Sequence, residues 1–337
     1  MDERFAEFDL IDLIASKVAR LEPSSGGVGR LRTGIGDDAA ITVPGGATAT
    51  SVDAIVEGVH FDRAWSPPDA ISHKAVAAAL SDLAAMAAAP GEVYVTLGVP
   101  PDTDRAWLES LAEGFAIAAE RFSVVLAGGD TVTSPVLFAS VTVVGHAPQD
   151  TGFVLRSGAR PGQLVVVTGS LGGAAAGLWL LSNGPGAADG MDEGLAEALI
   201  GRQLRPEPQI EAGLLLGAAG AASMVDLSDG LVADLGHVGR ASGVAIEIDS
   251  TLVPVQPGVP EVIASAGAET AAFVLAGGED FELAVTVEES AFLAAREGLA
   301  AAGIDLTAIG TVASGEGVSV VGPDGPVEVP AGFEHLA

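Results

Sequence analysis

The chain has 337 residues, more than one ordinary core accommodates, so we expect two domains. Its 45 acidic and 15 basic residues give a net charge of −30, which excludes the basic surface that nucleic-acid binding requires. The absence of Cys excludes disulfides, thiolate nucleophiles and Cys-ligated zinc. Apolar stretches end well short of the ~18 residues of a membrane span, and the acidic N-terminus lacks signal-peptide features, so we expect a cytoplasmic protein that binds no membrane.

Helices and strands are predicted to alternate along the first part of the chain. Apolar spacing and Gly/Pro breaks predict, in chain order, a helix over 7–20, a loop over 24–34, a strand over 47–53, a helix over 69–89, a strand over 93–99, a helix over 104–121 and strands over 124–129 and 136–147. A polar hinge over 156–162 follows. We place the domain boundary before it, giving domains 1–150 and 151–337.

The second part also alternates. It predicts strands over 164–169 and 244–249, helices over 174–181 and 288–302, a helix from Pro208 to about Ala219, and a strand and turn over 224–230 before a further helix. The sequence Val-Leu-Ala-Gly-Gly occurs at 125–129 and at 274–278, each time followed by a carboxylate. This echo predicts that one strand–Gly-Gly–carboxylate arrangement is used twice.

The common phosphate-binding motifs are missing. Neither lysine, Lys17 or Lys74, follows a glycine, so the P-loop is excluded, and the protein-kinase motifs His-Arg-Asp and Asp-Phe-Gly are absent. The run Gly34–Ala39 matches the dinucleotide pattern GxGxxA, but it follows a loop and carries two carboxylates where a pyrophosphate would lie. Any bound polyphosphate would therefore be neutralised largely by metal ions.

Carboxylates instead recur at strand ends and in glycine turns. They are Asp37, Asp38, Asp53, Asp130, Asp226, Asp229, Glu279 and Asp280. Each one alone fits ordinary turn chemistry. Taken together, these carboxylates favour the interpretation as a Mg²⁺ site, because Mg²⁺ binds one or two carboxylates together with phosphate oxygens.

Asp82 lies on the predicted Ala-rich helix among small apolar neighbours at i±3 and i±4. A carboxylate in such a stripe needs a partner, which is a metal ion or a hydrogen-bond donor from a neighbouring loop. We favour the metal. Three other features each allow two interpretations. The loop Gly169–Gly173 fits either a phosphate site or a structural turn. Arg156 fits either a ligand contact or a surface residue, and His60 fits either a contact to an anionic substrate or a structural role.

These motifs resemble, in order along nearly the whole chain, those of the thiamine-monophosphate kinases, which belong to the superfamily typified by aminoimidazole ribonucleotide synthetase. The matching segments are FDLIDLIA, GIGDDAA, SVDAIVEGVHF, ISHKAVAAALSDLAAMAAAP, LAGGDT, VLRSGARPG, VDLSDGLVADLGH, LAGGEDFEL and GFEH. The resemblance implies a two-domain α/β fold. In it the N-terminal sheet pairs across a homodimer into a β-barrel, and the C-terminal α/β domain closes over nucleotide and substrate.

The resemblance also implies a function, namely Mg²⁺-dependent transfer of a phosphate from ATP to thiamine monophosphate. The implied metal ligands are Asp38, Ser51, Asp53, Asp82, Asp130, Asp226 and Asp229. The implied ATP contacts are Gly129, Asp130, Arg156 and Ser228, and the implied substrate contacts are His60, Glu279 and Phe333. Val52 departs from the family, which often has Thr there, so we leave it out.

We expect direct in-line transfer without a phosphoenzyme, because the acceptor phosphate is already anionic near neutral pH and needs no general base. The alternative is another ATP-using synthetase of the same superfamily, of the purine-pathway type. Superfamily members that act through a Cys are excluded, since the chain has none. A non-catalytic acidic protein that binds divalent cations would leave the Gly-Gly turns and Arg156 unexplained.

Overall fold

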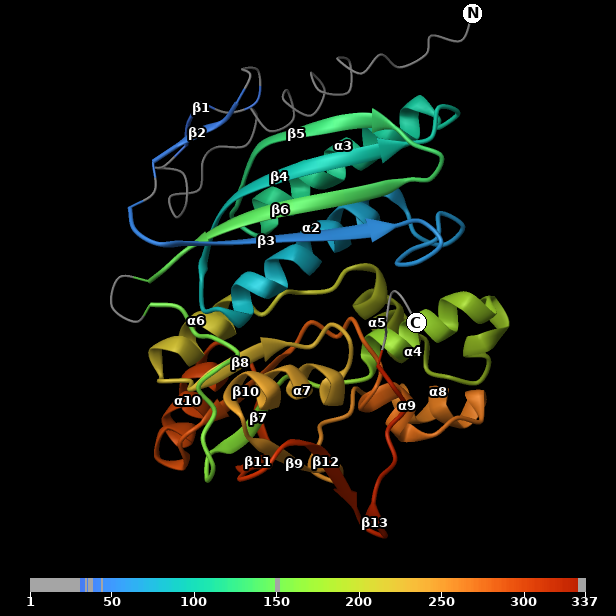
Figure 1. Ribbon diagram of the computed structural model, residues 1–337. Coiled ribbons are helices and arrows are strands. Elements are labelled where there is room, and N and C mark those ends of the chain that lie inside the picture. The colour runs from blue at the N-terminus through green and yellow to red at the C-terminus, as the bar shows by residue number, and fades with distance from the viewer. Residues whose placement is uncertain (1–30, 34, 36–38, 44, 149–151, 333–337) are drawn as a thin grey trace, which may run out of the picture. The chain divides into compact units, whose positions relative to one another are not determined.

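The computed structural model describes residues 31–33, 35, 39–43, 45–148 and 152–332 (Figure 1). The chain forms two compact units, one of Met1–Leu83 and Ala88–Ala147 and one of Ala84–Ala87 and Pro148–Ala337. The predicted helix over 7–20 lies outside the described residues. Each unit has its own sheet.

The first unit contains a small sheet, a four-stranded sheet and most of two helices. Its elements are β1 (Leu31–Thr33), β2 (Ile41–Thr42), β3 (Thr48–Val56), α2 (Pro68–Ala85), β4 (Ala89–Val99), α3 (Arg105–Arg121), β5 (Val125–Thr133) and β6 (Phe138–His146). The strand order of the larger sheet is β3-β6-β4-β5, with β4 and β5 parallel and the other pairs antiparallel. Strand β1 falls inside the predicted loop, so the loop prediction is wrong there.

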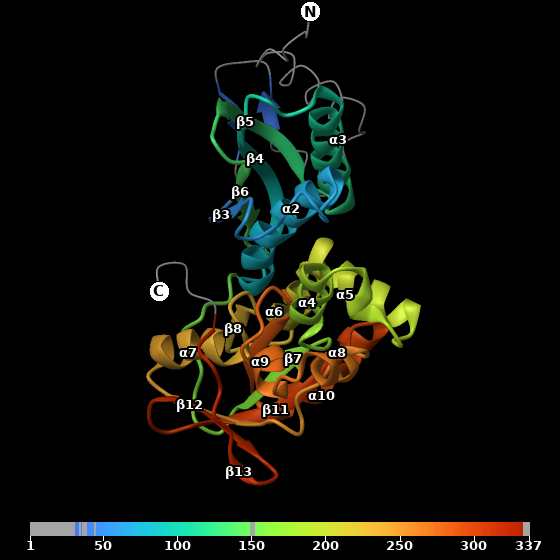
Figure 2. The ribbon, with the colours of Figure 1, turned by 90° about the vertical axis from the view of Figure 1, so that its right-hand side faces the viewer.

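Helices α2 and α3 cover one face of the four-stranded sheet (Figure 2). Strand β3 shows the resulting alternation, because Ala49 and Ile55 are buried whereas Thr50, Val52 and Ala54 are exposed. Side chains two residues apart on a strand share a face. Ser51 and Asp53 therefore lie on the same face as Ala49 and Ile55.

The second unit contains a seven-stranded sheet with strand order β13-β12-β9-β11-β7-β10-β8. Its elements are β7 (Leu164–Thr168), α4 (Gly173–Asn183), a 3₁₀ helix (Pro185–Ala188), α5 (Glu193–Leu204), α6 (Ile210–Ala218), β8 (Ser223–Asp226), α7 (Leu231–Ser242), β9 (Ala245–Asp249), α8 (Val259–Ala266), α9 (Thr270–Val274), β10 (Leu283–Val287), α10 (Glu289–Ala301), β11 (Leu306–Ala313), β12 (Gly317–Gly322) and β13 (Gly325–Pro326). Neighbouring strands are antiparallel except for β9 and β12.

The packing of strand β7 explains why its sequence is a nearly continuous apolar run. Val165 and Val167 belong to one hydrophobic cluster, which includes residues of α4, α5, α7 and α8. Val166 belongs to another, which includes residues of α6 and α10. Helices therefore cover both faces of the strand, and no position on it needs to be polar.

The predicted echo of Val-Leu-Ala-Gly-Gly is wrong as a structural repeat. At 125–129 it forms part of strand β5, whereas at 274–278 it begins at the last residue of helix α9 and continues into a segment outside any strand. The local sequence is the same, but a strand needs partners on the sheet, and tertiary packing supplied them only once.

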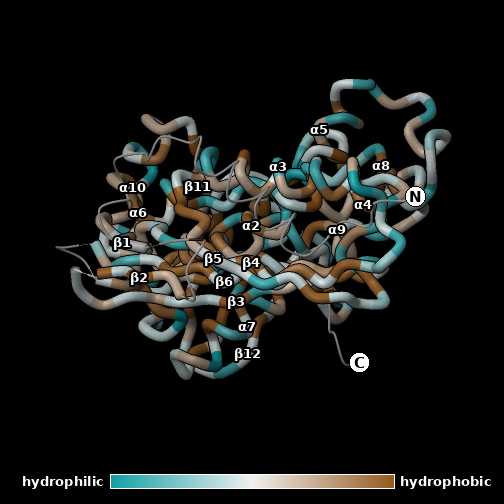
Figure 3. Tube along the Cα trace, turned by 90° about the horizontal axis from the view of Figure 1, so that it is seen from above, coloured by the Kyte–Doolittle hydropathy of each residue, from teal (hydrophilic) through white to brown (hydrophobic). Residues whose placement is uncertain are grey.

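The hydrophobic segments of the chain (brown in Figure 3) are interrupted by hydrophilic ones (teal). Among the helices that the structure describes, none has both the length and the apolar character needed to span a bilayer.

Ser123 is an exposed non-glycine residue in the left-handed region, with φ of 55°. We expect Ser123→Gly to raise the free energy of unfolding by about 0.5 kcal/mol, because relief of the left-handed strain (~1–2 kcal/mol) exceeds the entropic cost of glycine (~0.5–1 kcal/mol). Ser110→Gly, at an exposed position within α3, is the matched control and should lower it by a few tenths of a kcal/mol. Urea unfolding followed by tryptophan fluorescence measures both, and changes of the same sign would contradict the strain argument.

Candidate functional site

In the first unit, Ser51, Asp53 and Asp82 form a polar group against an apolar background. The hydroxyl of Ser51 on β3 donates a short hydrogen bond to Oδ2 of Asp82 on α2. Asp82 has the small buried neighbours predicted for it, among them Ala78, Ala79 and Ala85. Asp53 shares the helix-facing side of β3 with Ser51. A strand and a helix thus bring two carboxylates and a hydroxyl to one side of the sheet.

The side chain of Val52 explains why the sequence departure at this position is compatible with such a group. It is 62% exposed, on the face of β3 opposite Ser51 and Asp53. A hydroxyl at this position would therefore point away from Asp82.

Asp130 and Gly129 lie on β5, the edge strand of the same sheet, where they line a cavity. Its walls are apolar, with Val95, Leu97 and Phe115 among them. A Cβ on Gly129 would lie 2.0 Å from the carbonyl oxygen of Val95, so only glycine fits there. The edge strand therefore carries a carboxylate beside a small apolar cavity.

His60 lies in the turn that follows β3 and is held at two points. Its Nδ1 accepts a hydrogen bond from the backbone N–H of Val56 at 3.1 Å, so Nδ1 carries no proton there. Its carbonyl oxygen accepts from Nζ of the buried Lys74 at 2.9 Å. The hydrogen bond from Val56 therefore fixes the orientation of the ring.

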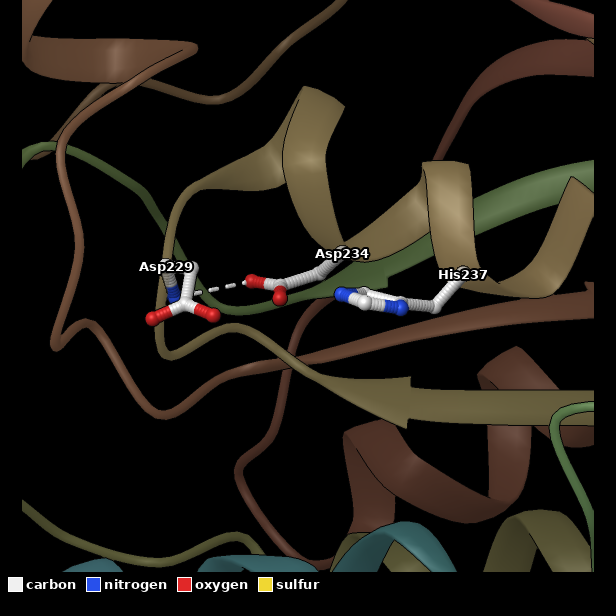
Figure 4. Close-up of side chains that lie close together, drawn as sticks. All are labelled: Asp229, Asp234 and His237. Carbon is white, nitrogen blue, oxygen red and sulfur yellow. Dashed lines mark hydrogen bonds between the residues drawn. The ribbon is translucent and has the colours of Figure 1, made fainter. Parts of the chain in front are cut away.

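In the second unit, the turn Ser228–Gly230 wraps around the carboxylate of Asp234 (Figure 4). Oδ2 of Asp234, in the first turn of α7, accepts from the backbone N–H groups of Ser228, Asp229 and Gly230 at 3.0, 3.0 and 3.1 Å. These bonds hold the turn directly after β8. The sequence analysis missed Asp234. The available signal was an acidic residue in the first turn of a helix, where it satisfies unpaired N–H groups.

Three carboxylates crowd this turn. Burial, followed by the charge of Asp226, raises the pKa of Asp234 to about 8, and the charge of Asp229 acts in the same direction against the hydrogen bonds from the turn. Asp226 is itself buried at the end of β8. Either a proton or a cation relieves this repulsion, and a hard cation prefers the oxygen ligands gathered here.

His237, on the same helix, lies between this turn and Arg156. Ligand atoms of Asp229, Asp234 and His237 lie within 4.8 Å of one another. Burial and the positive charges of Arg156 and Arg240 lower the pKa of His237, whereas Asp229 opposes the shift. The positive charge of Arg156 therefore acts on His237.

The C-terminal end of α7 holds the loop that carries Arg156. The hydroxyl of Ser242 accepts from the N–H groups of Gly158 and Ala159 at 3.1 Å each and donates to the carbonyl oxygen of Arg156 at 3.3 Å. One helix thus positions Ser228 and Asp229 at its start and the backbone of Arg156 at its end. Ser228 and Asp229 are thus held at one end of α7, and the backbone of Arg156 is held at the other.

Glu279 lies in a strained segment beside the same turn. Both Glu279 (φ 65°) and Phe281 (φ 50°) adopt the left-handed conformation, which costs roughly 1–2 kcal/mol for a residue with a Cβ. Their N–H groups donate to the carbonyl oxygens of Ser228 at 2.8 Å and Leu227 at 2.9 Å. Strain of this kind clusters at ligand sites. The carboxylate of Glu279 accepts a hydrogen bond from Gln203, a residue that the sequence analysis did not single out.

The loop Gly169–Gly173 is a structural turn, and its interpretation as a phosphate site is wrong. The N–H groups of Gly172 and Ala174 donate to the buried carboxylate of Asp280 at 2.7 and 3.1 Å. The N–H groups of Gly169 and Leu171 donate to backbone carbonyl oxygens. An internal carboxylate therefore occupies the N-terminus of α4, where a phosphate would have to bind.

The predicted site residues thus lie at several places in the two units. Ser51, Asp53 and Asp82 share one side of the first unit's sheet, while Gly129 and Asp130 on its edge strand and His60 after β3 occupy other parts of that unit. The second unit brings together Asp226, Ser228, Asp229 and Glu279 at the turn after β8, whereas the backbone of Arg156 lies at the other end of α7. Asp38 and Phe333 lie outside the described residues, as does Asp37.

Asp280 makes the free energy of unfolding depend on pH, and the direction of this dependence follows from its pKa. Burial raises its pKa from 3.8 to about 6, although Arg202 and the N–H groups of Gly172 and Ala174 lower it. The folded protein therefore holds this proton more tightly than the unfolded chain, so the contribution is largest at low pH and is lost as the pH rises through about 6. From pH 5 to pH 7.5, we expect the free energy of unfolding of Asp280→Asn to rise by about 1 kcal/mol relative to that of wild type. Urea unfolding at both pH values measures this change.

Asp249→Asn is the control with the opposite sign. The hydroxyl and N–H of Thr251 lower the pKa of Asp249, so its contribution is present at neutral pH and lost on acidification. This variant should lose stability relative to wild type as the pH rises toward 3.8, the pKa of an unperturbed Asp, and the difference should stay constant between pH 5 and pH 7.5. A pH-independent difference between Asp280→Asn and wild type would contradict the pKa argument.

Family models match both parts of the chain. Residues 36–147 match the AIR synthase related protein N-terminal domain, and residues 160–322 match the corresponding C-terminal domain. Among curated relatives, thiamine-monophosphate kinase of Escherichia coli (strain K12) is 39% identical over 308 residues, covering 90% of this chain and 92% of the relative. That of Bacillus subtilis (strain 168) is 36% identical over 309 residues, covering 91% of each.

Similar solved structures support the same family assignment. Thiamine-monophosphate kinase from Stenotrophomonas maltophilia K279a superposes with a TM-score of 0.78 at 33% identity, over 94% of this chain and 96% of that one. The structure of AaThiL complexed with AMPPCP and TMP gives a TM-score of 0.76 at 32% identity, covering 100% and 99%. The two-domain α/β fold inferred from the sequence is confirmed, and the chain belongs to the thiamine-monophosphate kinase family.

Proposed function

We propose that this protein transfers a phosphate from ATP to thiamine monophosphate, giving thiamine diphosphate. The relatives described above carry this activity in their names, and the AaThiL structure contains both an ATP analogue and thiamine monophosphate. The observation that carries the proposal is the contact between Asp82 and Ser51 beside Asp53, because it provides a set of oxygen ligands against an otherwise apolar helix face.

The donor set fits Mg²⁺. All the residues proposed to hold it offer oxygen atoms, which hard cations prefer, and the chain contains no Cys. They are Asp38, Ser51, Asp53, Asp82, Asp130, Asp226 and Asp229. Crowding of Asp226, Asp229 and Asp234 supports the same assignment, since a cation there offsets their repulsion. When bound, the ions screen the negative charge of both phosphate groups.

The remaining residues divide between the two substrates. Gly129, Asp130, Arg156 and Ser228 would contact ATP, with Arg156 supplying a permanent positive charge. His60, Glu279 and Phe333 would contact thiamine monophosphate, whose thiazolium ring is cationic and therefore complements the carboxylate of Glu279. Because Ser242 and Asp234 fix the backbones of Arg156 and Ser228, these contacts are preorganised for the nucleotide.

We also propose that the protein is a cytoplasmic homodimer in which the N-terminal sheets pair into a barrel. Helices α2 and α3 cover one face of this sheet, while β3 exposes Thr50, Val52 and Ala54 on the other. An exposed apolar residue in the middle of a strand, such as Val52, favours burial against a second sheet. Closure of two sheets into a barrel also removes exposed strand edges.

Asp82→Asn tests the metal-binding role. Loss of one carboxylate at an oxygen-ligand site should lower kcat for ADP formation by at least about 100-fold, with the melting temperature close to that of wild type. Asp102→Asn, at an exposed position of the same unit, should keep full activity. Activity is measured with thiamine monophosphate and, separately, with formylglycinamidine ribonucleotide. Turnover of the second compound only would identify the purine-pathway alternative.

Direct in-line transfer has a stereochemical consequence. With ATP made chiral at the γ-phosphate, a single displacement inverts the configuration at phosphorus, so we expect thiamine diphosphate of inverted configuration. The reaction needs no base, because the acceptor phosphate is already an anion. Analysis of the product's configuration checks this, and net retention would indicate two displacements through a phosphoenzyme.

A further inference from the structure

Gln203, near the C-terminal end of α5, is buried, with 4% of its surface exposed. Its Nε2 donates a hydrogen bond to Oε2 of Glu279 at 2.9 Å. A carboxylate accepts hydrogen bonds but cannot donate them, so the amide must present its NH₂ group to Glu279. A buried donor that binds an ionised acceptor makes one of the stronger hydrogen bonds in a protein.

The backbone around Glu279 is fixed by other groups. The N–H of Glu279 donates to the carbonyl oxygen of Ser228, and a Cβ on Gly278 would lie 2.3 Å from that same oxygen. Arg202 donates to the carbonyl oxygen of Asp280 and to Oε1 of Glu282, both at 2.9 Å. These contacts hold the chain, but the side chain of Glu279 keeps rotatable bonds of its own.

Arg202 and Gln203 are consecutive residues of α5 with different targets. Arg202 binds the backbone and a carboxylate beyond Glu279, whereas Gln203 reaches the carboxylate of Glu279 itself. Gln203 also packs against α4, because a Cβ on Gly177 would lie 3.1 Å from its Cβ. Gln203 is thus packed against α4 at its Cβ, while its amide binds the side chain of Glu279.

We infer that Gln203 is a positioning residue, which orients the carboxylate of Glu279 toward the thiamine part of the substrate. The inference rests on the proposed function, in which Glu279 contacts thiamine monophosphate. By holding Oε2, Gln203 fixes the orientation of the carboxylate that we propose to meet the cationic thiazolium or the amino group of the pyrimidine. Its effect therefore concerns affinity for thiamine monophosphate, and neither ATP binding nor the transfer step.

Gln203→Met keeps the length of the side chain and removes the donor. We expect the KM for thiamine monophosphate to rise about tenfold, while the KM for ATP and kcat stay within about threefold of wild type. Gln203→Glu, which sets a carboxylate against Glu279, should raise the same KM at least as much. Steady-state ADP release measures these constants, and circular dichroism verifies the fold.

Gln163→Met is the matched control. Gln163 is also a buried glutamine, 2% exposed, and its Nε2 donates to Oε1 of Glu288 at 2.8 Å. The substitution removes the same kind of hydrogen bond, together with the one that Oε1 of Gln163 accepts from the N–H of Arg160 at 2.9 Å. None of these residues has a proposed role, so both KM values should remain at wild-type levels. A rise of the KM for thiamine monophosphate in this control, equal to that of Gln203→Met, would overturn the inference.

A double-mutant cycle tests whether Gln203 acts through Glu279. In a Glu279→Ala background, Gln203→Met should change the KM for thiamine monophosphate less than about twofold. A full tenfold effect in that background, an unchanged KM in the single variants, or unfolding of both Gln203 variants while Gln163→Met folds would overturn the inference alone. Absence of wild-type turnover with thiamine monophosphate would overturn the proposed function, and this inference with it.

Discussion

Repulsion between neighbouring carboxylates constrains the candidate site, and much of the surrounding structure offsets it. At the turn after β8, burial and the charges of Asp226 and Asp229 raise the pKa of Asp234, because water does not fully screen these charges. Three consecutive N–H groups from the turn partly compensate Asp234. A hard cation bound here would offset the negative charge that remains.

The structure distinguishes two uses of acidic residues that look alike in sequence. Asp280 is satisfied internally, because its carboxylate accepts N–H groups at the start of α4. Asp82 instead receives a hydroxyl from Ser51, on a helix face that offers no other polar partner of its own. A carboxylate saturated by backbone donors stabilises the fold, whereas one with remaining lone pairs beside other carboxylates is suited to bind a metal ion.

Helices α5 and α7 hold in place the segments of the second unit that carry predicted site residues. Helix α7 fixes the turn carrying Ser228 through Asp234 and the Arg156 loop through Ser242. Helix α5 holds the strained segment around Glu279 through Arg202 and Gln203. The left-handed conformation of Glu279 is stable because these hydrogen bonds and the backbone contacts to Leu227 and Ser228 outweigh its local cost.

The sequence by itself determined the features that depend on local pattern. Apolar periodicity located α2, α3, α7 and α10 and most strands, and the isolation of Asp82 among small residues marked it as a polar position that needs a partner. The order of the motifs determined the family. These features are predictable because they arise from residues close together in the chain.

Only the tertiary structure decided which partners distant residues receive. It assigned the N-terminus of α4 to Asp280, more than a hundred residues away, and so excluded a phosphate from the loop Gly169–Gly173. It gave Val-Leu-Ala-Gly-Gly a strand at 125–129 but not at 274–278, and it brought Gln203, on a helix absent from the sequence-based prediction, to Glu279. Hydrogen bonds across such separations depend on how sheets and helices pack, which local sequence does not specify.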